Sequence, residues 1–139
     1  MEQRPLELST DFTYALDLLE NQGYELAVAS SSAPELIEAV LQKLNIKHRF
    51  IVVRSAQHEA FGKPHPQVFI TTSELLKVAP QNCIVLEDSF HGVIAAKAAK
   101  MKVIAVPDPS EINDPKFGAA DLVIASLEKL SDKLLRSLD

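Results

Sequence analysis

The stretch Cys83-Ile84-Val85-Leu86-Glu87-Asp88-Ser89 places two adjacent carboxylates directly after a short apolar run. Such a run, bounded by polar residues, is typical of a strand buried inside a sheet. Carboxylates at the end of a buried strand lose hydration, so they need a cation or hydrogen-bond donors beside them. The stretch therefore predicts a buried strand with a charged site at its carboxyl end.

Apolar runs of this kind alternate with segments of helical periodicity along the rest of the chain. Strands are predicted at residues 24–29, 50–53, 82–87 and 103–106, with a last apolar run at 122–125. Helices are predicted from a cap at residues 9–11 to near residue 23, at residues 34–45, 66–77 and 92–100, and from about residue 127. Continuous apolar strands separated by helices are typical of a parallel sheet covered on both faces. We therefore expect one α/β domain over residues 1–139, a three-layer Rossmann-like parallel sheet.

Composition and charge exclude several classes of partner. The net charge is −5, and the 14 Lys and Arg residues are scattered, which gives no reason to expect a nucleic-acid partner. No apolar run approaches the length of a membrane span, and the first residues lack the apolar core of a signal peptide, so we expect a cytoplasmic protein without a membrane partner. The single Cys83 excludes a disulfide within the chain and is interpreted as a buried, inert thiol.

Polar residues follow the predicted strand at residues 24–29. Ser30, Ser31 and Ser32 stand before Pro34, where a helix is predicted to begin. A hydroxyl at a strand end and the free N–H groups of a helix start can hold a phosphate. The alternative interpretation is that Ser32 only caps the helix.

Lys63 lies in the sequence Gly62-Lys63-Pro64-His65-Pro66, where two prolines restrict the backbone and can hold the lysine in one direction. The alternative is a solvated surface charge. Glu87 and Asp88 could hold Mg²⁺, which prefers oxygen ligands and accepts one or two carboxylates. Their alternative is an acidic cluster favoured by a helix dipole. Because ligands gather at the carboxyl ends of parallel strands, we expect these groups to converge there.

The four histidines, by contrast, do not indicate a metal or catalytic site. None of them shows the spacing of metal ligands on one helix. His91 is the exception, because it follows Asp88 by three residues and could face the mouth of the site. The other three are His48, His58 and His65.

In combination and in this order, these elements resemble the haloacid dehalogenase superfamily of phosphotransferases. The sequence Ala27-Val28-Ala29-Ser30 is similar to the second motif of that superfamily, Lys63-Pro64-His65-Pro66 to the third, and Leu86-Glu87-Asp88-Ser89 with Gly92 to the fourth. The resemblance continues beyond Gly92 and is closest to the sugar-phosphatase and β-phosphoglucomutase-like branch. It covers nearly the whole chain.

The resemblance implies roles for five residues. Ser30 and the backbone N–H of Ser31 would hold a phosphoryl group, and Lys63 would neutralise its oxygens and orient the nucleophile. Asp88, helped by Glu87, would hold Mg²⁺. The implied substrate is a small phosphorylated metabolite, and the implied reaction is hydrolysis of a sugar-phosphate monoester. A β-phosphoglucomutase-like phosphotransfer is the neighbouring alternative.

One element of the superfamily pattern is missing. Its first motif is Asp-x-Asp after an apolar strand, and no Asp in these 139 residues is followed two positions later by another Asp. The first of those aspartates is the covalent nucleophile in the superfamily, so we expect little or no turnover from this chain by itself. The sequence alone therefore leaves open whether the chain is an enzyme.

The same motif implies a strand that would lie centrally in the sheet, between the Ser30 strand and the Glu87 strand, followed by a cap domain. We expect the chain to begin after that cap. Without the central strand, either two rows of backbone groups stay unpaired or the flanking strands close together. Three interpretations follow: a phosphatase segment without its nucleophile strand, a phosphate- and Mg²⁺-binding module completed by a partner, or an interaction domain with a vestigial site. An exposed sheet gap would also favour self-association.

Overall fold

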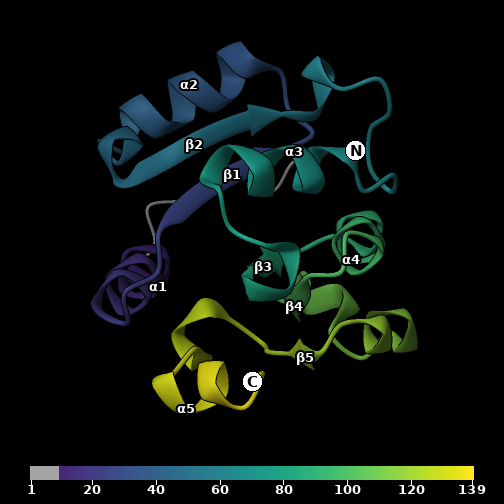
Figure 1. Ribbon diagram of the computed structural model, residues 1–139. Coiled ribbons are helices and arrows are strands. Elements are labelled where there is room, and N and C mark those ends of the chain that lie inside the picture. Colours follow the sequence, from purple (N-terminus) through teal and green to yellow (C-terminus); the bar gives the residue numbers. More distant parts are fainter. Residues whose placement is uncertain (1–9) are drawn as a thin grey trace.

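The computed structural model describes residues 10–139 and places their strands in two parallel sheets (Figure 1). The first sheet pairs β1 (Leu26–Ser30) with β2 (Phe50–Ser55). The second has the order β3 (Ile84–Glu87), β4 (Lys102–Ala105) and β5 (Leu122–Val123). All pairs are parallel, which confirms the predicted fold class.

Helices alternate with the strands, as the periodicity predicted, except that 3-10 turns join β4 to β5. They are α1 (Thr10–Asn21), α2 (Pro34–Lys43), α3 (Gln67–Leu76), α4 (Phe90–Ala98) and α5 (Asp132–Arg136). Residues 107–120 contain the short 3-10 turns Pro109–Glu111 and Pro115–Ala119. None of the helices described over residues 10–139 is long and apolar enough to cross a membrane.

The sheets are covered on both faces, so the three-layer expectation is confirmed. One apolar cluster joins the sheets to α1, α2 and α5, and the other joins them to α3 and α4. Along β4 the side chains alternate between the two clusters: Ile104 belongs to the first, whereas Val103 and Ala105 belong to the second. This alternation is what a strand with both faces buried must show.

The two sheets are not hydrogen-bonded to each other within residues 10–139. There, β1 pairs only with β2, and β3 pairs only with β4 (Figure 1). Val103, Ile104 and Ala105 of β4, which has a neighbour on each side, are fully buried. The first three residues of β3 and the last four of β1 are only half-buried. Of the two outcomes expected for the sheet, the structure therefore shows the gap and not closure of the flanking strands.

Two local expectations need correction. Ser32 does not cap α2, because the N-cap residue is Ala33, which makes no side-chain capping bond, and Pro34 occupies the first turn. The helix predicted from residue 92 begins earlier, at Phe90, because the Ser89 hydroxyl accepts a hydrogen bond from the Gly92 N–H and caps it. A Ser at this position is a strong N-cap signal that hydrophobic periodicity does not contain.

Candidate active site

The candidate site lies at the carboxyl ends of β1 and β3. Ser30 is the last residue of β1, and Glu87 is the last residue of β3. Lys63 comes from the loop that leaves β2 at the same edge and runs to α3. In a parallel sheet these ends point to one edge, so three segments distant in the sequence converge there.

Lys63 is held by three groups at this edge. Its Nζ atom lies 3.0 Å from Glu87 Oε2 and donates to the Ala29 carbonyl at 3.3 Å. It also lies 4.9 Å from the centroid of the Phe69 ring, within cation–π range. The side chains of Lys63 and Glu87 are each only 9% exposed. Lys63 therefore links the ends of the two sheets, and its interpretation as a solvated surface charge is wrong.

Glu87 is fixed from the opposite side by the start of α4. Its Oε1 atom accepts hydrogen bonds from the Ser89 N–H at 3.2 Å and from the Ser89 hydroxyl at 3.1 Å. Gly92 allows this arrangement, because a Cβ atom there would lie 2.0 Å from Glu87 Cδ. The carboxylate is thus compensated by a cation and by donors, as the opening sequence required.

The turn after β1 is closed by serine side chains. The Ser30 hydroxyl accepts a hydrogen bond from the Ser32 N–H at 3.1 Å. The Ser55 hydroxyl, at the end of β2, donates to the Ser32 carbonyl at 2.6 Å. Ser31, which lies between Ser30 and Ser32 in the sequence, is exposed. The turn is therefore ordered by neighbouring groups and leads directly into the first turn of α2.

The acidic residues suit a magnesium ion by their chemistry. Over residues 10–139 no group of three or more His, Cys, Asp or Glu side chains could hold a metal. Glu87 and Asp88 are consecutive at the end of β3, and Mg²⁺ is commonly held by one or two carboxylates with phosphate and water completing the shell. Glu87 and Asp88 are therefore the residues of this site that could hold the ion, and Glu87 also pairs with Lys63.

The histidines stay outside the contacts of this site. His48 and His58 lie in 3-10 turns and are exposed. The His65 ring stacks on Phe61 with centroids 4.9 Å apart, and its Nδ1 accepts from the Gln67 N–H. His91 is exposed on α4, with its ring 6.4 Å from that of Phe90.

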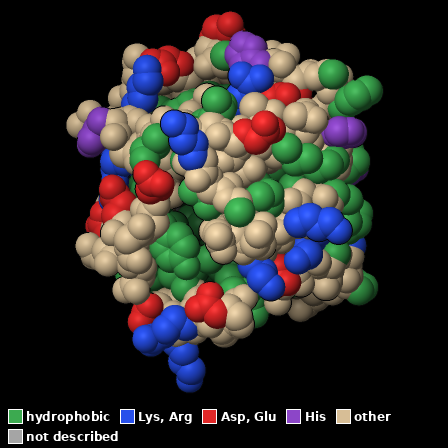
Figure 2. Space-filling view, in the orientation of Figure 1, with side chains coloured by type: hydrophobic (Ala, Val, Ile, Leu, Met, Phe, Trp, Pro, Cys, Tyr) green, Lys and Arg blue, Asp and Glu red, His purple; other side chains and the backbone are tan. Residues whose placement is uncertain are grey.

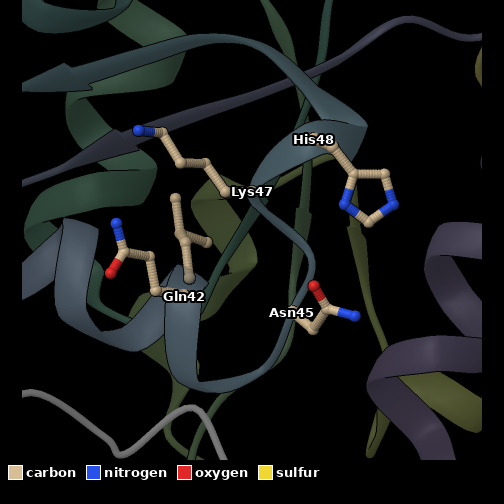
Figure 3. Close-up of a pocket in the computed structure, with 5 residues that line it drawn as sticks. Gln42, Asn45, Lys47 and His48 are labelled. Carbon is tan, nitrogen blue, oxygen red and sulfur yellow. The ribbon is translucent and has the colours of Figure 1, made fainter.

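A pocket of about 410 Å³ opens elsewhere, at the carboxyl end of α2. Figure 3 shows that the side chains at its rim point in different directions and do not converge on one point. Gln42 and Lys47 both donate to the Glu38 carboxylate. Because these residues precede β2, the pocket lies at the amino ends of the strands, opposite Lys63 and Glu87. It is not part of the candidate active site. Its lining residues are Leu41, Gln42, Asn45, Lys47 and His48.

Two further observations bear on the sequence expectations. On the face shown in Figure 2, the described Lys and Arg side chains are interspersed with Asp and Glu side chains. Cys83 is half-buried and not buried as predicted, but its partial burial still raises the pKa of the thiol, which supports an inert role for it.

The sequence model of the haloacid dehalogenase-like hydrolases matches residues 1–106, and the chain belongs to that family. The predicted resemblance is thereby confirmed.

Known proteins similar to this chain include phosphatases and a mutase. The chain is 40% identical over 119 residues to hexitol phosphatase B of Escherichia coli K12, which covers 86% of this chain and 54% of that protein. It is 34% identical over 119 residues to β-phosphoglucomutase of Bacillus subtilis, covering 84% of this chain and 49% of the enzyme. The chain thus spans about half the length of these relatives.

Solved structures agree with the fold. The β-phosphoglucomutase of Clostridium difficile superimposes with a TM-score of 0.79 at 26% identity, over 92% of this chain and 54% of that one. CbbY of Rhodobacter sphaeroides, solved in complex with phosphate, gives a TM-score of 0.79 at 26% identity, over 88% of this chain and 55% of its own.

Sequence reasoning missed several groups that shape the site. The Ala29 carbonyl and the Phe69 ring both contact Lys63, and Ser55 secures the turn after Ser30. No local pattern marks them, because each acts through a contact distant in the sequence. Gly92 is the exception, because it belongs to the resemblance to the fourth motif.

Proposed function

We propose that this chain supplies the phosphate- and Mg²⁺-binding part of a phosphatase that hydrolyses a small sugar-phosphate monoester. The observation that carries the proposal is Lys63, whose buried ammonium group joins the carboxyl ends of β1 and β3 beside Glu87. The similarity to a hexitol phosphatase supports the substrate class.

Each site residue has a role in this proposal. Ser30 and the backbone N–H of Ser31 hold the phosphoryl oxygens at the start of α2, where the helix dipole favours an anion. Lys63 neutralises charge that develops on those oxygens, and Glu87 keeps the ammonium group in place. Asp88 holds Mg²⁺ with the support of Glu87. When bound, the ion would neutralise phosphate charge, a major source of acceleration in phosphoryl transfer.

Turnover needs a nucleophile that these residues do not include. We propose that it comes from an Asp-x-Asp segment that forms a strand between β1 and β3. There, the two sheets of residues 10–139 make no hydrogen bonds to each other. Such a strand would satisfy the facing edges of both sheets and bring its carboxylate beside Lys63. By itself, the chain is then of low or no activity.

The test compares the chain with a version extended by an apolar segment that carries Asp-x-Asp. We expect Mg²⁺-dependent hydrolysis of p-nitrophenyl phosphate only from the extended protein. Changing the first Asp of the added segment to Asn, or Lys63→Ala, should abolish it. A folded extended protein that stays inert with a panel of hexitol and hexose phosphates would refute the proposal.

The sheet gap also favours a second candidate, a phosphate-binding module completed by another chain. In this case a second copy or a different protein supplies the strand, and self-association should depend on the β1 and β3 edges. Sedimentation would show a dimer that the added strand dissociates. The similarity to a mutase favours phosphotransfer as the variant reaction, and interconversion of glucose phosphates by the extended protein would reveal it.

A further inference from the structure

The loop that carries Lys63 is anchored by polar side chains outside the proposed site. This loop joins β2 to α3 and begins with the 3-10 turn Ala56–His58. Next to that turn, the Glu59 side chain is only 7% exposed. Its Oε1 atom accepts from Arg54 Nε at 2.7 Å, and its Oε2 atom accepts from the Thr71 hydroxyl at 3.1 Å. A carboxylate this buried needs both partners.

Thr71 connects the two ends of the loop. Its hydroxyl donates to Glu59 and at the same time accepts from Gln67 Nε2 at 3.0 Å. Glu59 lies four residues before Lys63, and Gln67 lies four residues after it. A single hydroxyl of α3 therefore closes the base of the loop at whose centre Lys63 stands.

The segment between these anchors has little freedom. Three residues separate Glu59 from Lys63, and an extended residue spans at most about 3.6 Å, so fixing Glu59 limits where the Lys63 backbone can go. On the other side, the His65 N–H donates to the Gly62 carbonyl at 3.0 Å, and the Gln67 N–H donates to His65 Nδ1 at 3.1 Å. The fixed base of the loop therefore also restricts the position of Lys63.

We propose that Thr71 is a positioning residue for Lys63. By joining Glu59 to Gln67, its hydroxyl holds the loop where Lys63 Nζ reaches both Glu87 and the Ala29 carbonyl. The link to phosphate binding rests on the proposed function, whereas the control of Lys63 itself rests only on the contacts above.

The variant Thr71→Val tests this, because it keeps the branched shape and removes the hydroxyl. The neighbouring Thr72→Val is the matched control: the Thr72 hydroxyl bonds the Val68 carbonyl of its own helix at 2.7 Å and not the loop. The readout is the rate at which an amine-acylating reagent modifies Lys63, measured by peptide mass spectrometry. Lys47, whose side chain is 53% exposed, serves as the internal reference. Circular dichroism verifies that each variant is folded.

A buried lysine reacts only when its surroundings open. We expect Thr71→Val to accelerate Lys63 modification about fivefold, the factor that corresponds to losing one net hydrogen bond. Thr72→Val should leave the rate unchanged. Equal rates in wild type and folded Thr71→Val would overturn the proposal. So would an equal acceleration in Thr72→Val, because the effect would then be a general loosening of α3.

Orthophosphate binding, followed by thermal shift, separates this inference from the proposed function. If both hold, Thr71→Val weakens the orthophosphate-induced shift and Thr72→Val does not. If wild type shows no shift but Thr71→Val still accelerates Lys63 modification, the positioning role stands and phosphate binding by this chain fails.

Discussion

Gly92→Ala should displace Glu87 and disrupt the candidate site without removing any polar group. An added Cβ atom would lie 2.0 Å from Glu87 Cδ, 2.2 Å from Oε2 and 2.4 Å from Cγ. Carbon atoms in ordinary contact are about 3.5 to 4.0 Å apart, so the Glu87 side chain must move by roughly 1.5 Å or more. The 3.0 Å contact with Lys63 and the bonds from Ser89 cannot survive that shift.

The magnitude follows from two opposing effects. Overpacking of a buried site costs about 1 to 3 kcal/mol, and separating Lys63 from Glu87 adds to it. Alanine is favoured over glycine in a helix interior by about 1 kcal/mol, and by less in the first turn, where Gly92 lies. We therefore expect a net loss of about 2 kcal/mol in the free energy of unfolding, or several degrees in Tm.

Urea denaturation followed by circular dichroism measures this loss, with Gly118→Ala as the control. A Cβ atom at Gly118 has nothing within 4 Å, so that variant should stay close to wild type. In a Glu87→Ala background the obstacle is gone, and Gly92→Ala should become neutral or stabilising. Equal stability of Gly92→Ala, Gly118→Ala and wild type, or an unchanged penalty in the Glu87→Ala background, would refute the reasoning.

Three further predictions concern charged and polar groups. Lys63→Met leaves the Glu87 carboxylate without its cation and should lower the free energy of unfolding, measured by denaturant titration, by about 3 kcal/mol. Adding Glu87→Gln to this variant should recover part of the loss, and no recovery would contradict a charge effect. Burial disfavours the ionised form of the Asp121 carboxyl, but hydrogen bonds from Lys97 and the Val103 N–H outweigh burial and hold its pKa below the usual 3.8. The contribution of this carboxylate to stability is therefore present above that pH and is lost as pH falls through the lowered value. Asp121→Asn should accordingly lose about 1 kcal/mol at pH 7, and the difference from wild type should vanish in acid; a difference independent of pH would refute this. Ser89→Ala removes both the cap of α4 and a donor to Glu87, so it should cost about 1 to 2 kcal/mol, more than Ser110→Ala on the exposed turn Pro109–Glu111 measured in the same titration.

Much of the fold could be predicted because the strands of a covered parallel sheet have continuous apolar sequences. Ile84–Glu87 falls within the predicted segment 82–87, although it is only half-buried beside the gap, and the buried strand Lys102–Ala105 overlaps the predicted segment 103–106. The last strand was harder, because only Leu122–Val123 pairs within the predicted run at 122–125. The start of α4 was misplaced, since Ser89 sets it through a hydrogen bond and not through periodicity.

The candidate residues could be named from motifs, but their contacts could not. The sequence placed Lys63 between two prolines without showing that its ammonium group would be buried. Burial depends on Ala29, Phe69 and Glu87, which come from three other segments. The role of Thr71 was equally hidden, because a threonine inside a helix usually bonds its own helix, as Thr72 does.

By itself, the sequence determined the alternation of strands and helices, the family resemblance, and the absence of an Asp-x-Asp pair, because each of these is a local pattern of residues. Only the tertiary structure decided that β1 and β3 stay apart over residues 10–139, and that Lys63 joins their ends by pairing with Glu87. The physical reason is that both results depend on packing between distant segments. Two apolar clusters hold the sheets in place from either face, and a buried charge must take whichever partner that packing brings within reach.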